Sequence, residues 1–353
     1  MKKIFRKIKK KFYIKNFDGL NIRQIDEVVI NPVLRCNLKC VMCHQGEIKC
    51  HKDMSFDKFE KILTNLKMSG VTKVSLIGGE IFVMEDIWRY IKKLEEMNFK
   101  YDLSSNLFYV PELEKLRYLK GLEMITTSID GDLETHNKIR GNPMAFQNAT
   151  KNIKRLLSMG IVVDVACVVQ KANINILEKV ASIAFELGIK RMTFLVANKI
   201  TLEEKKAAIS EIENLTGADV NFYVSTKENI LGNLNESDYA KIPSKIMTIK
   251  NIARICGAHV HFSVQLENPS LLNKKFPLRD FTCSLFSGYG SYVYEDGSFN
   301  TCAFTKLSGE KFDISKHKPL KILNSGEYYK IRKRFYDYGA AEKCRYCCAL
   351  RRK

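Results

Sequence analysis

Long apolar runs are missing from this chain. None of its 353 residues lies in an uninterrupted run of 18 apolar residues, whereas a helix that spans a bilayer needs about 20. The basic amino-terminal residues also lack the apolar segment of a secretory signal peptide. We therefore expect no membrane-spanning helix and no secretion, and we expect the protein to be cytoplasmic.

Acidic side chains are absent from residues 1–15, which carry eight lysines and arginines. A second basic group lies in residues 330–353, and the formal net charge is +19. This imbalance favours an anionic partner such as a phosphate ester or a membrane surface. A plainly solvated basic surface is the alternative. Nucleic acid is less favoured, because the sequence shows charge without a set of aromatic stacking platforms.

Three apolar residues at the amino-terminus, Ile4, Ile8 and Phe12, would share one face of a helix, with Phe5 beside them. Such a helix could lie against the inner face of an anionic membrane and make a peripheral contact there. The alternative, which we favour slightly, is a frayed basic tail.

The cysteine count is odd. Eleven cysteines, arranged largely in two groups, argue against a disulfide framework and for metal sites in a reducing compartment. In the first group Cys36, Cys40 and Cys43 are separated by three and two residues. Three thiolates can hold three irons of a cubane cluster and leave the fourth iron open. A zinc knuckle or three unrelated core cysteines is the alternative, although zinc normally takes four ligands.

Strand and helix patterns alternate from about residue 26. The first helix is predicted to begin after Ser55 and to end at Gly70. A glycine also follows later predicted helical stretches, at Gly121, Gly160 and Gly188, and there we expect the left-handed conformation that ends a helix. The apolar strand candidates are residues 28–34, 74–78, 101–105, 124–129, 162–169 and 192–197.

Six alternating units predict an α/β fold in which parallel strands are joined by right-handed crossovers. Six strands are too few for a closed eight-stranded barrel, so we expect an open, partial (β/α)6 barrel with its site at the carboxyl ends of the strands. Beyond residue 200 we expect a helix over 202–215, a strand over 220–224, a linker around Pro243 and a strand over 260–264. The predicted divisions are a basic extension 1–25, the barrel with its connecting segment 26–265, and a small cysteine-rich domain 266–353.

Polar motifs follow the carboxyl ends of the predicted strands. Alternation along the fourth strand places Ser128 and Asp130 on the face that points into the barrel mouth. On the fifth strand it places Cys167 on the opposite face, against helices. The motifs are Gly78-Gly79-Glu80 after the second strand, Ser104-Ser105-Asn106 after the third, Ser128-Ile129-Asp130-Gly131 after the fourth, and His136 with Arg140-Gly141 shortly beyond.

The cysteine spacing and the strand-end motifs resemble the radical SAM superfamily. The resemblance implies a 4Fe-4S cluster on Cys36, Cys40 and Cys43, whose open iron binds S-adenosylmethionine (SAM). Reductive cleavage of SAM then gives methionine and a 5′-deoxyadenosyl radical, which abstracts a hydrogen atom from the substrate. The implied SAM-binding residues are Met42 on the adenine face, Gly78, Gly79 and Glu80 at the amino group, Asn106, Ser128 and Asp130 toward the ribose and carboxylate, and Arg140 as a carboxylate clamp.

Two positions depart from the pattern of that family. Met42 stands where the family usually has an aromatic residue, although methionine can still pack on an adenine face. Ile81 follows Gly78-Gly79-Glu80 where the family usually has proline, so the turn there is expected to differ.

The second cysteine group is Cys283, Cys302, Cys344 and Cys347. Asp296-Gly297 is a hairpin turn between two short strands, 289–294 and 299–302, and it brings Cys283 near Cys302. The four thiolates could take zinc. Next to a radical SAM barrel, however, the spacing resembles the SPASM and twitch extensions, which hold auxiliary 4Fe-4S clusters. Only Cys348 follows, so the twitch form with one auxiliary cluster fits better. Whether Cys348 replaces Cys347 stays open.

The two implied clusters suggest a function. A cluster held by four cysteines has no open iron, so its expected role is to accept an electron from the substrate. The net reaction would be a two-electron oxidation. We expect a dehydrogenase acting on a small, polar, sugar-like substrate, which could carry phosphate, with flavodoxin or ferredoxin as the reductant. About 25 residues precede the first strand, fewer than a leader-peptide-binding domain needs.

Two other functions stay open. The protein could be a maturase that crosslinks, epimerises or oxidises a ribosomally made peptide or protein. It could also be a non-catalytic iron–sulfur module for electron transfer. Cys50 and Cys256 have no partner spacing, and we expect neither to be a metal ligand.

Overall fold

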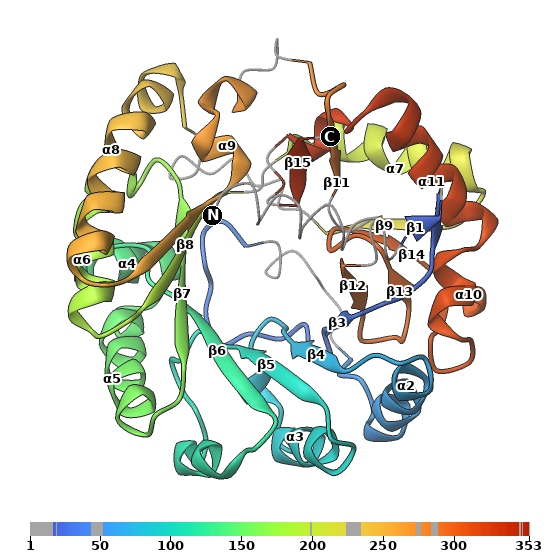
Figure 1. Ribbon diagram of the computed structural model, residues 1–353, viewed down its shortest axis with the longest axis horizontal. Helices are drawn as coiled ribbons and strands as arrows, with labels where there is room; N and C mark the ends of the chain where they lie inside the picture. Colours follow the sequence, from blue (N-terminus) through green and yellow to red (C-terminus); the bar gives the residue numbers. More distant parts are fainter. Residues whose placement is uncertain are drawn as a thin grey trace.

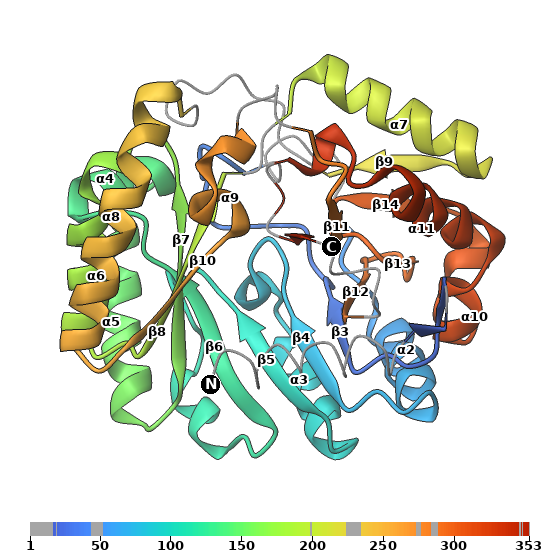
Figure 2. The same cartoon turned by 45° about the horizontal axis from the view of Figure 1, so that its top comes forward.

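The computed structural model describes residues 17–18, 20–43, 52–197, 200–223, 234–272, 277–283, 289–345, 347 and 349–352. The basic segment 1–15, Cys50 and Cys348 lie outside these described residues. A strongly curved sheet forms the centre of the molecule, and helices surround its outer side (Figures 1 and 2). No helix in the described part of the chain is long and apolar enough to cross a membrane.

The central sheet contains nine described strands in the order β10-β8-β7-β6-β5-β4-β3-β12-β13. All neighbouring strands run parallel except β12 and β13. The six strands predicted before residue 200 occupy six consecutive positions, which confirms the open, partial barrel. The bounds are β3 Glu27–Ile30, β4 Lys73–Leu76, β5 Lys100–Ser104, β6 Leu122–Ser128, β7 Val163–Val169, β8 Arg191–Val196, β10 His259–Phe262, β12 Tyr289–Val293 and β13 Phe299–Asn300.

Two further parallel strands extend the sheet beyond those six. β10 lies beside β8, so the strand expected over 260–264 is present and belongs to the barrel. β12 lies beside β3, and its partner β13 follows an Asp296-Gly297 turn in which Gly297 has φ of +90°. The carboxy-terminal hairpin is therefore hydrogen-bonded to the first barrel strand. The domain boundary at residue 265 stays a prediction.

Helices between the strands cover the outer face of the sheet (Figure 1). The first of them confirms the expected signals: the Ser55 side chain accepts a hydrogen bond from the Lys58 amide, and Gly70 beyond the helix has φ of +80°. The barrel helices are α2 Phe56–Met68, η2 Ile81–Val83, α3 Ile87–Glu96, η3 Leu113–Tyr118, α4 Leu133–Arg140, α5 Ala145–Ser158, η4 Ile174–Ile176, α6 Leu177–Glu186 and α8 Glu236–Ile255.

Burial alternates along the strands, as expected for a sheet with helices on one face only. In β7, Val163, Val165, Cys167 and Val169 are buried, whereas the residues between them are half-buried. Cys167 is fully buried in the hydrophobic core, and the Asn173 amide nitrogen lies 3.7 Å from its sulfur. The prediction that Cys167 faces away from the barrel interior is confirmed.

Two local predictions are wrong. Gly121 is not in the left-handed region, unlike Gly160 and Gly188. Glycine is needed at position 121 because a Cβ there would lie 2.4 Å from the Phe99 carbonyl oxygen. The region around Pro243 is not a linker but lies inside α8, which packs against α6.

Burial explains why the proline is tolerated in α8. An interior proline removes one helix hydrogen bond and costs about 3 kcal/mol. The flanking helix buries an apolar stripe, and burial of one such side chain contributes about 1.5–3 kcal/mol. The stripe is Ile242, Ile246, Ile249 and Ala253.

The carboxy-terminal region packs on the β3 side of the barrel and is joined by part of the β8–β10 crossover. β9 from this crossover pairs with β14, and α7 packs against α11. β11 pairs with β15, which brings Cys283 opposite Leu350. The remaining elements are β1 Phe17–Asp18, β2 Asn21–Ile22, α7 Leu202–Thr216, β9 Val220–Phe222, α9 Val264–Glu267, η5 Pro269–Leu272, β11 Phe281–Cys283, β14 Thr305–Leu307, η7 Glu310–Phe312, α10 Pro319–Leu323, α11 Gly326–Tyr338, η8 Glu342–Cys344 and β15 Leu350–Arg352.

Candidate active site

The three-cysteine loop follows the carboxyl end of β3, where a site in a parallel barrel is expected. The loop is held from both sides by backbone hydrogen bonds. On one side the amides of Gly79 and Glu80 donate to the carbonyls of Val33 and Arg35, at 2.8 and 2.9 Å. On the other side the Val41 amide donates to the last turn of α4, at 2.9 Å. The structure thus fixes the loop between two of the motifs singled out in the sequence.

Hydrogen-bond donors lie close to two of the sulfur atoms of this loop, those of Cys36 and Cys40. The Leu38 amide nitrogen lies 3.4 Å from the Cys36 sulfur, and the Asn106 side-chain nitrogen lies 3.7 Å from it. An Arg140 guanidinium nitrogen lies 3.8 Å from the Cys40 sulfur. Burial, together with Cys40, Glu80 and Cys43, raises the pKa of the Cys36 thiol to about 11. The Cys36 thiol is therefore protonated at pH 7, and binding of a metal would release its proton.

These cysteines fit an iron–sulfur cluster by the chemistry of their surroundings. Hydrogen bonds to cluster sulfurs and a nearby positive charge are common protein contributions to such sites. Within the described part of the chain, no group of three or more histidines, cysteines and carboxylates already has the geometry of a metal cage. Metal binding is coupled to local folding and to deprotonation of the ligands, so we expect the thiols to be drawn together when the cluster binds.

Gly78 and Gly79 are required by the close approach of two backbone segments. A Cβ on Gly79 would lie 2.2 Å from the carbonyl oxygen of Arg35, and one on Gly78 would lie 2.7 Å from that of Val33. Both distances are shorter than the non-bonded contacts that Cβ atoms make with oxygen in real proteins. The two glycines therefore let the second strand end lie directly against the residues that lead into the cysteine loop.

Glu80 ties two strand ends together. One carboxylate oxygen accepts hydrogen bonds from the Phe82 amide at 3.1 Å and from the Ser105 hydroxyl at 2.9 Å. The other accepts from the Asn106 amide at 2.7 Å. The side chain is 1% exposed, and burial raises its pKa to about 7 despite these bonds. A carboxylate has about four acceptor positions, so one is left for a ligand.

Asp130 and Arg140 form a buried pair beside the cysteine loop. The Arg140 Nε donates to an Asp130 oxygen at 2.7 Å, while the other Asp130 oxygen accepts from the Val168 amide at 2.8 Å. The Asp130 amide donates to Nδ1 of His136 at 3.1 Å. Burial, together with the Arg140 charge, lowers the pKa of His136 to about 4. His136 is therefore neutral at pH 7 and acts as an acceptor.

Other predicted SAM contacts lie near this centre. Asn106 follows β5 and donates to the Asn37 side chain at 2.8 Å. Ser128 ends β6 and is half-buried, level with Ala166 on β7. Met42 lies in the turn closed by the hydrogen bond from the Cys43 amide to the Cys40 carbonyl, at 3.1 Å. The roles of these residues in binding SAM stay predictions.

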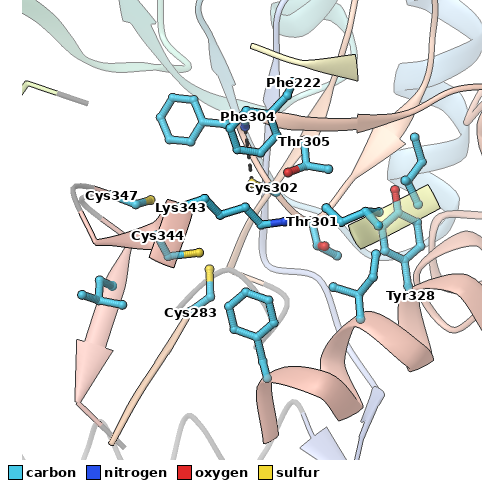
Figure 3. Close-up of a pocket in the computed structure, with 15 residues that line it drawn as sticks. Phe222, Cys283, Thr301, Cys302, Phe304, Thr305, Tyr328, Lys343, Cys344 and Cys347 are labelled. Atoms are coloured by element: carbon cyan, nitrogen blue, oxygen red, sulfur yellow. Dashed lines mark hydrogen bonds between the residues drawn. The ribbon is translucent and has the colours of Figure 1, made fainter. Parts of the chain in front are cut away.

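The second cysteine group also converges. Cys283, Cys302, Cys344 and Cys347 all line one apolar cavity in the carboxy-terminal region (Figure 3). The pairing of β11 with β15 brings Cys283 to the Cys344–Cys347 side, and the β12–β13 hairpin delivers Cys302. The apolar and aromatic lining residues include Phe222, Phe304, Phe335, Leu307 and Leu350.

The second group fits a metal centre by the same test as the first. The Phe304 amide lies 3.4 Å from the Cys302 sulfur, and the Ala349 amide lies 3.4 Å from the Cys347 sulfur. Burial raises the pKa of Cys344 to about 12, against the lowering effect of Lys343. Four thiols in one buried cavity suit zinc or an iron–sulfur cluster. The role of these cysteines as ligands stays a prediction.

Sequence reasoning missed several residues that hold the two centres in place. Ser105 lies in a motif that was noticed, but its bond to Glu80 required the fold. Asn173 donates to the carbonyls of Asp130 and Val168, at 2.8 and 2.9 Å. Gln265 in α9 donates to the carbonyls of Arg345 and Cys347, at 2.9 and 2.7 Å. No local pattern marks Asn173 or Gln265.

A three-cysteine loop after the first strand of a partial barrel, backed by a glycine-glycine-glutamate turn, is the arrangement that the sequence led us to expect for a cluster with one open iron. Residues 30–184 match the family profile described as Radical SAM superfamily. Residues 30–184 thus carry a radical SAM domain. The family implies a 4Fe-4S cluster and SAM as cofactors.

Two curated relatives illustrate the range of the sequence similarity. The chain is 25% identical over 293 residues to Fe-coproporphyrin III synthase of Methanosarcina barkeri, covering 78% of this chain and 68% of that protein. It is 30% identical over 166 residues to the antilisterial bacteriocin subtilosin biosynthesis protein AlbA of Bacillus subtilis. That match covers 45% of this chain and only 37% of AlbA.

Solved structures share the fold over nearly the whole chain. SuiB of Streptococcus suis superposes with a TM-score of 0.66 and 18% identity, covering 96% of this chain and 75% of SuiB. The enzyme anSMEcpe, solved with bound AdoMet and a peptide, superposes with a TM-score of 0.65 and 17% identity, covering 91% of this chain and 88% of anSMEcpe. These likenesses confirm the fold class predicted from the sequence.

Proposed function

We propose that this radical SAM enzyme oxidises a side chain of a peptide or protein and uses a second iron–sulfur cluster in its carboxy-terminal region to accept an electron. The observation that carries the proposal is the convergence of Cys283, Cys302, Cys344 and Cys347 on one buried cavity. Four protein ligands leave no open iron for substrate or SAM. A closed site of this kind is suited to moving electrons.

The substrate class rests on the relatives. AlbA takes part in the biosynthesis of a bacteriocin, SuiB was solved bound to its precursor peptide SuiA, and anSMEcpe was solved bound to a peptide. These names support a peptide substrate better than the sugar-like substrate expected from the sequence, which stays a prediction without a supporting relative among them. A peptide modified by crosslinking or by side-chain oxidation loses two hydrogens, as the second cluster requires.

A second candidate substrate is a tetrapyrrole. Fe-coproporphyrin III synthase of Methanosarcina barkeri matches 78% of this chain, against 45% for AlbA. Such a substrate carries carboxylates, and the net charge of +19 suits an anion. The two candidates differ in size and colour, so one set of assays separates them.

Different residues of this chain would have different roles at the first cluster. When bound, the cluster supplies the electron that cleaves SAM. Cys36, Cys40 and Cys43 would hold it, and Arg140 and Asn106 donate toward their sulfurs. Glu80 has one acceptor position left for the SAM ammonium, and Gly78 and Gly79 set the position of the turn that presents it.

The surface beside the cysteine loop suits an acidic reductant. Lys39 and Lys138 are exposed around the loop and the end of α4, whereas the exposed Arg35 is paired with Asp53. Flavodoxin or ferredoxin, the reductants expected from the sequence, would be attracted to such a surface by long-range electrostatics. Contact with a membrane through residues 1–15 stays a prediction, because that segment lies outside the described residues.

The first test is metal analysis after anaerobic reconstitution. We expect about eight irons per chain, since each cubane cluster holds four. Replacing Cys36, Cys40 and Cys43 by alanine should leave about four irons, and replacing Cys344 and Cys347 should also leave about four. Zinc in the carboxy-terminal site would contradict its role in electron transfer.

The second test is mass spectrometry of products formed in heavy water. The reduced enzyme is given SAM with peptides encoded beside its gene, with Fe-coproporphyrin precursors, or with sugar phosphates. A peptide two mass units lighter, formed with one 5′-deoxyadenosine each, supports the proposal. Deuterium uptake without oxidation would indicate epimerisation and contradict the proposed oxidation. Conversion of the tetrapyrrole or of the sugar phosphate, in place of the peptide, would contradict the proposed peptide substrate.

A further inference from the structure

Lys343 places a positive charge at the four-cysteine cavity. It precedes Cys344, and it is the only lysine, arginine, aspartate or glutamate among the described residues that line the cavity. Its side chain is 9% exposed and extends across the cavity between the labelled cysteines and Thr301 (Figure 3). The ammonium lies 5.7 Å from the centre of the Phe222 ring. The remaining lining is largely apolar, so water does little to screen this charge.

Glu211 on α7 provides the matching negative charge. One of its carboxylate oxygens lies 3.6 Å from the Lys343 ammonium, and the other accepts from Arg334 Nε at 2.8 Å. The Lys343 ammonium also donates to the Ala208 carbonyl at 3.4 Å. α7 belongs to the crossover between β8 and β10, not to the chain segment that carries the cysteines. The charge at the cavity is therefore set by two distant parts of the sequence.

Two other cations near this region are paired with carboxylates of their own. Arg345 is 1% exposed and is held by both carboxylate oxygens of Glu342. Lys306 is held between Glu295 and Asp296, at 3.1 and 2.7 Å. Neither cation lines the cavity. Arg334 is a third charge here, and it is paired with Glu211 at 2.8 Å without lining the cavity. Lys343 therefore remains the charge at the cavity itself, and Glu211 the carboxylate that opposes it.

We propose that Lys343 raises, and Glu211 lowers, the reduction potential of the iron–sulfur centre held by Cys283, Cys302, Cys344 and Cys347. This inference rests on the proposed function, in that it requires a redox-active centre at these cysteines. One electron taken from the substrate radical, which also loses a proton, adds one negative charge to the cavity. A nearby cation stabilises that charge and a nearby anion opposes it. Lys343 would thus favour transfer of the electron out of the substrate.

The experiment uses the full chain with Cys36, Cys40 and Cys43 replaced by alanine, so that only the carboxy-terminal centre contributes. Its potential is measured by spectroelectrochemical titration against dithionite with mediators. Lys343→Met should lower the potential, with a roughly tenfold change in the ratio of reduced to oxidised centre at fixed potential, which is about 59 mV for one electron. Glu211→Gln should raise it. Lys343→Arg keeps the charge and should leave the potential close to that of the parent chain.

Matched controls come from the same region. Lys316 is 52% exposed and pairs with Glu310 at 3.0 Å, so Lys316→Met and Glu310→Gln should leave the potential unchanged. High salt should shrink the effect of Glu211→Gln, because Glu211 is 40% exposed, but should leave most of the Lys343→Met effect.

The outcomes separate the inference from the proposed function. Opposite shifts in Lys343→Met and Glu211→Gln, at unchanged iron content, support the inference. About four irons with an unchanged potential in both variants would overturn it and leave the proposed function standing. Zinc or no metal in the parent chain would overturn both, since no centre then accepts an electron.

Discussion

The Arg140 guanidinium lies between the Asp130 carboxylate, at 2.7 Å, and the sulfur of Cys40, at 3.8 Å. Asp130 is fully buried and Arg140 is 8% exposed. One cation thus joins the fourth strand end of the predicted barrel to the cysteine loop. The sequence suggested Arg140 as a clamp for the SAM carboxylate. The structure adds a reason for its fixed orientation.

Asp130→Asn should destabilise the fold by about 3–5 kcal/mol, because it leaves the Arg140 charge buried without a counter-ion. Arg140→Met should cost a similar amount by leaving Asp130 unpaired. The double variant should recover part of the loss. Urea unfolding of the four proteins measures these values. Additive losses would contradict direct coupling between the two side chains.

Glu80→Ala should weaken SAM binding without removing the cluster. The variant loses the acceptor proposed for the SAM ammonium, whereas Cys36, Cys40 and Cys43 are untouched. Equilibrium binding of SAM to the reconstituted protein and its iron content give the two readings. Unchanged SAM affinity would show that the free acceptor position of Glu80 is not used.

Glu80 should also make stability fall as pH rises. Its pKa is raised from 4.5 to about 7 by burial, so the folded state binds the proton more tightly than the unfolded state. The free energy of unfolding should therefore decrease between pH 4.5 and 7, by about 3 kcal/mol from this group alone. Glu80→Gln should remove that slope. A slope that persists in the variant would assign it to another group.

His136 should act in the opposite sense. Its pKa is lowered from 6.5 to about 4, so the unfolded state takes up the proton first as pH falls. Its contribution is complete above pH 6.5 and is lost as pH falls toward 4, again by about 3 kcal/mol. His136→Leu should remove this loss, although it leaves the Asp130 amide without its acceptor. Because the two slopes oppose each other in the parent chain, unfolding must be followed in each variant.

Gly79→Ala should destabilise the fold far more than Gly160→Ala. At Gly79 the new methyl group would lie 2.2 Å from the Arg35 carbonyl oxygen, and forced overlap of this kind costs about 1–3 kcal/mol or more. At Gly160 no atom lies within 4 Å, so only the strain of φ at +78° remains, about 1 kcal/mol. Urea midpoints compare the two. Equal losses would show that the strand end relaxes away from the cysteine loop.

Local patterns were sufficient to predict the six barrel strands and their order. Four of the six predicted strands follow a glycine that ends a helical stretch, and sequential parallel strands usually lie next to each other. The same reasoning failed at Pro243, because a buried apolar stripe outweighs the local preference of proline. It also failed at Gly121, where a close contact with Phe99 requires glycine and the left-handed conformation does not occur.

Hydrogen-bond partners that lie far apart in the sequence could not be predicted from local sequence patterns. The Ser104-Ser105-Asn106 motif was visible, but the bonds from Ser105 and Asn106 to Glu80 depend on the placement of β4 beside β5. Glu211 lies beside Lys343 because α7 packs against α11 in the carboxy-terminal region. The sequence motifs predicted the positions of the candidate sites, whereas the hydrogen-bond and ion-pair partners at those sites could be identified only from the fold.

The pairing of β12 with β3 has a consequence for synthesis of the chain. Tyr289 lies opposite Glu27, so the second neighbour of the first barrel strand is translated 289 − 27 = 262 residues later. At about 5–20 residues per second this interval lasts roughly 13–50 s. Until the hairpin is translated, β3, which leads into the three-cysteine loop, has no partner strand on this side. Chains that terminate before residue 289 should therefore aggregate through that edge, and chaperone contact with it should end when the hairpin emerges.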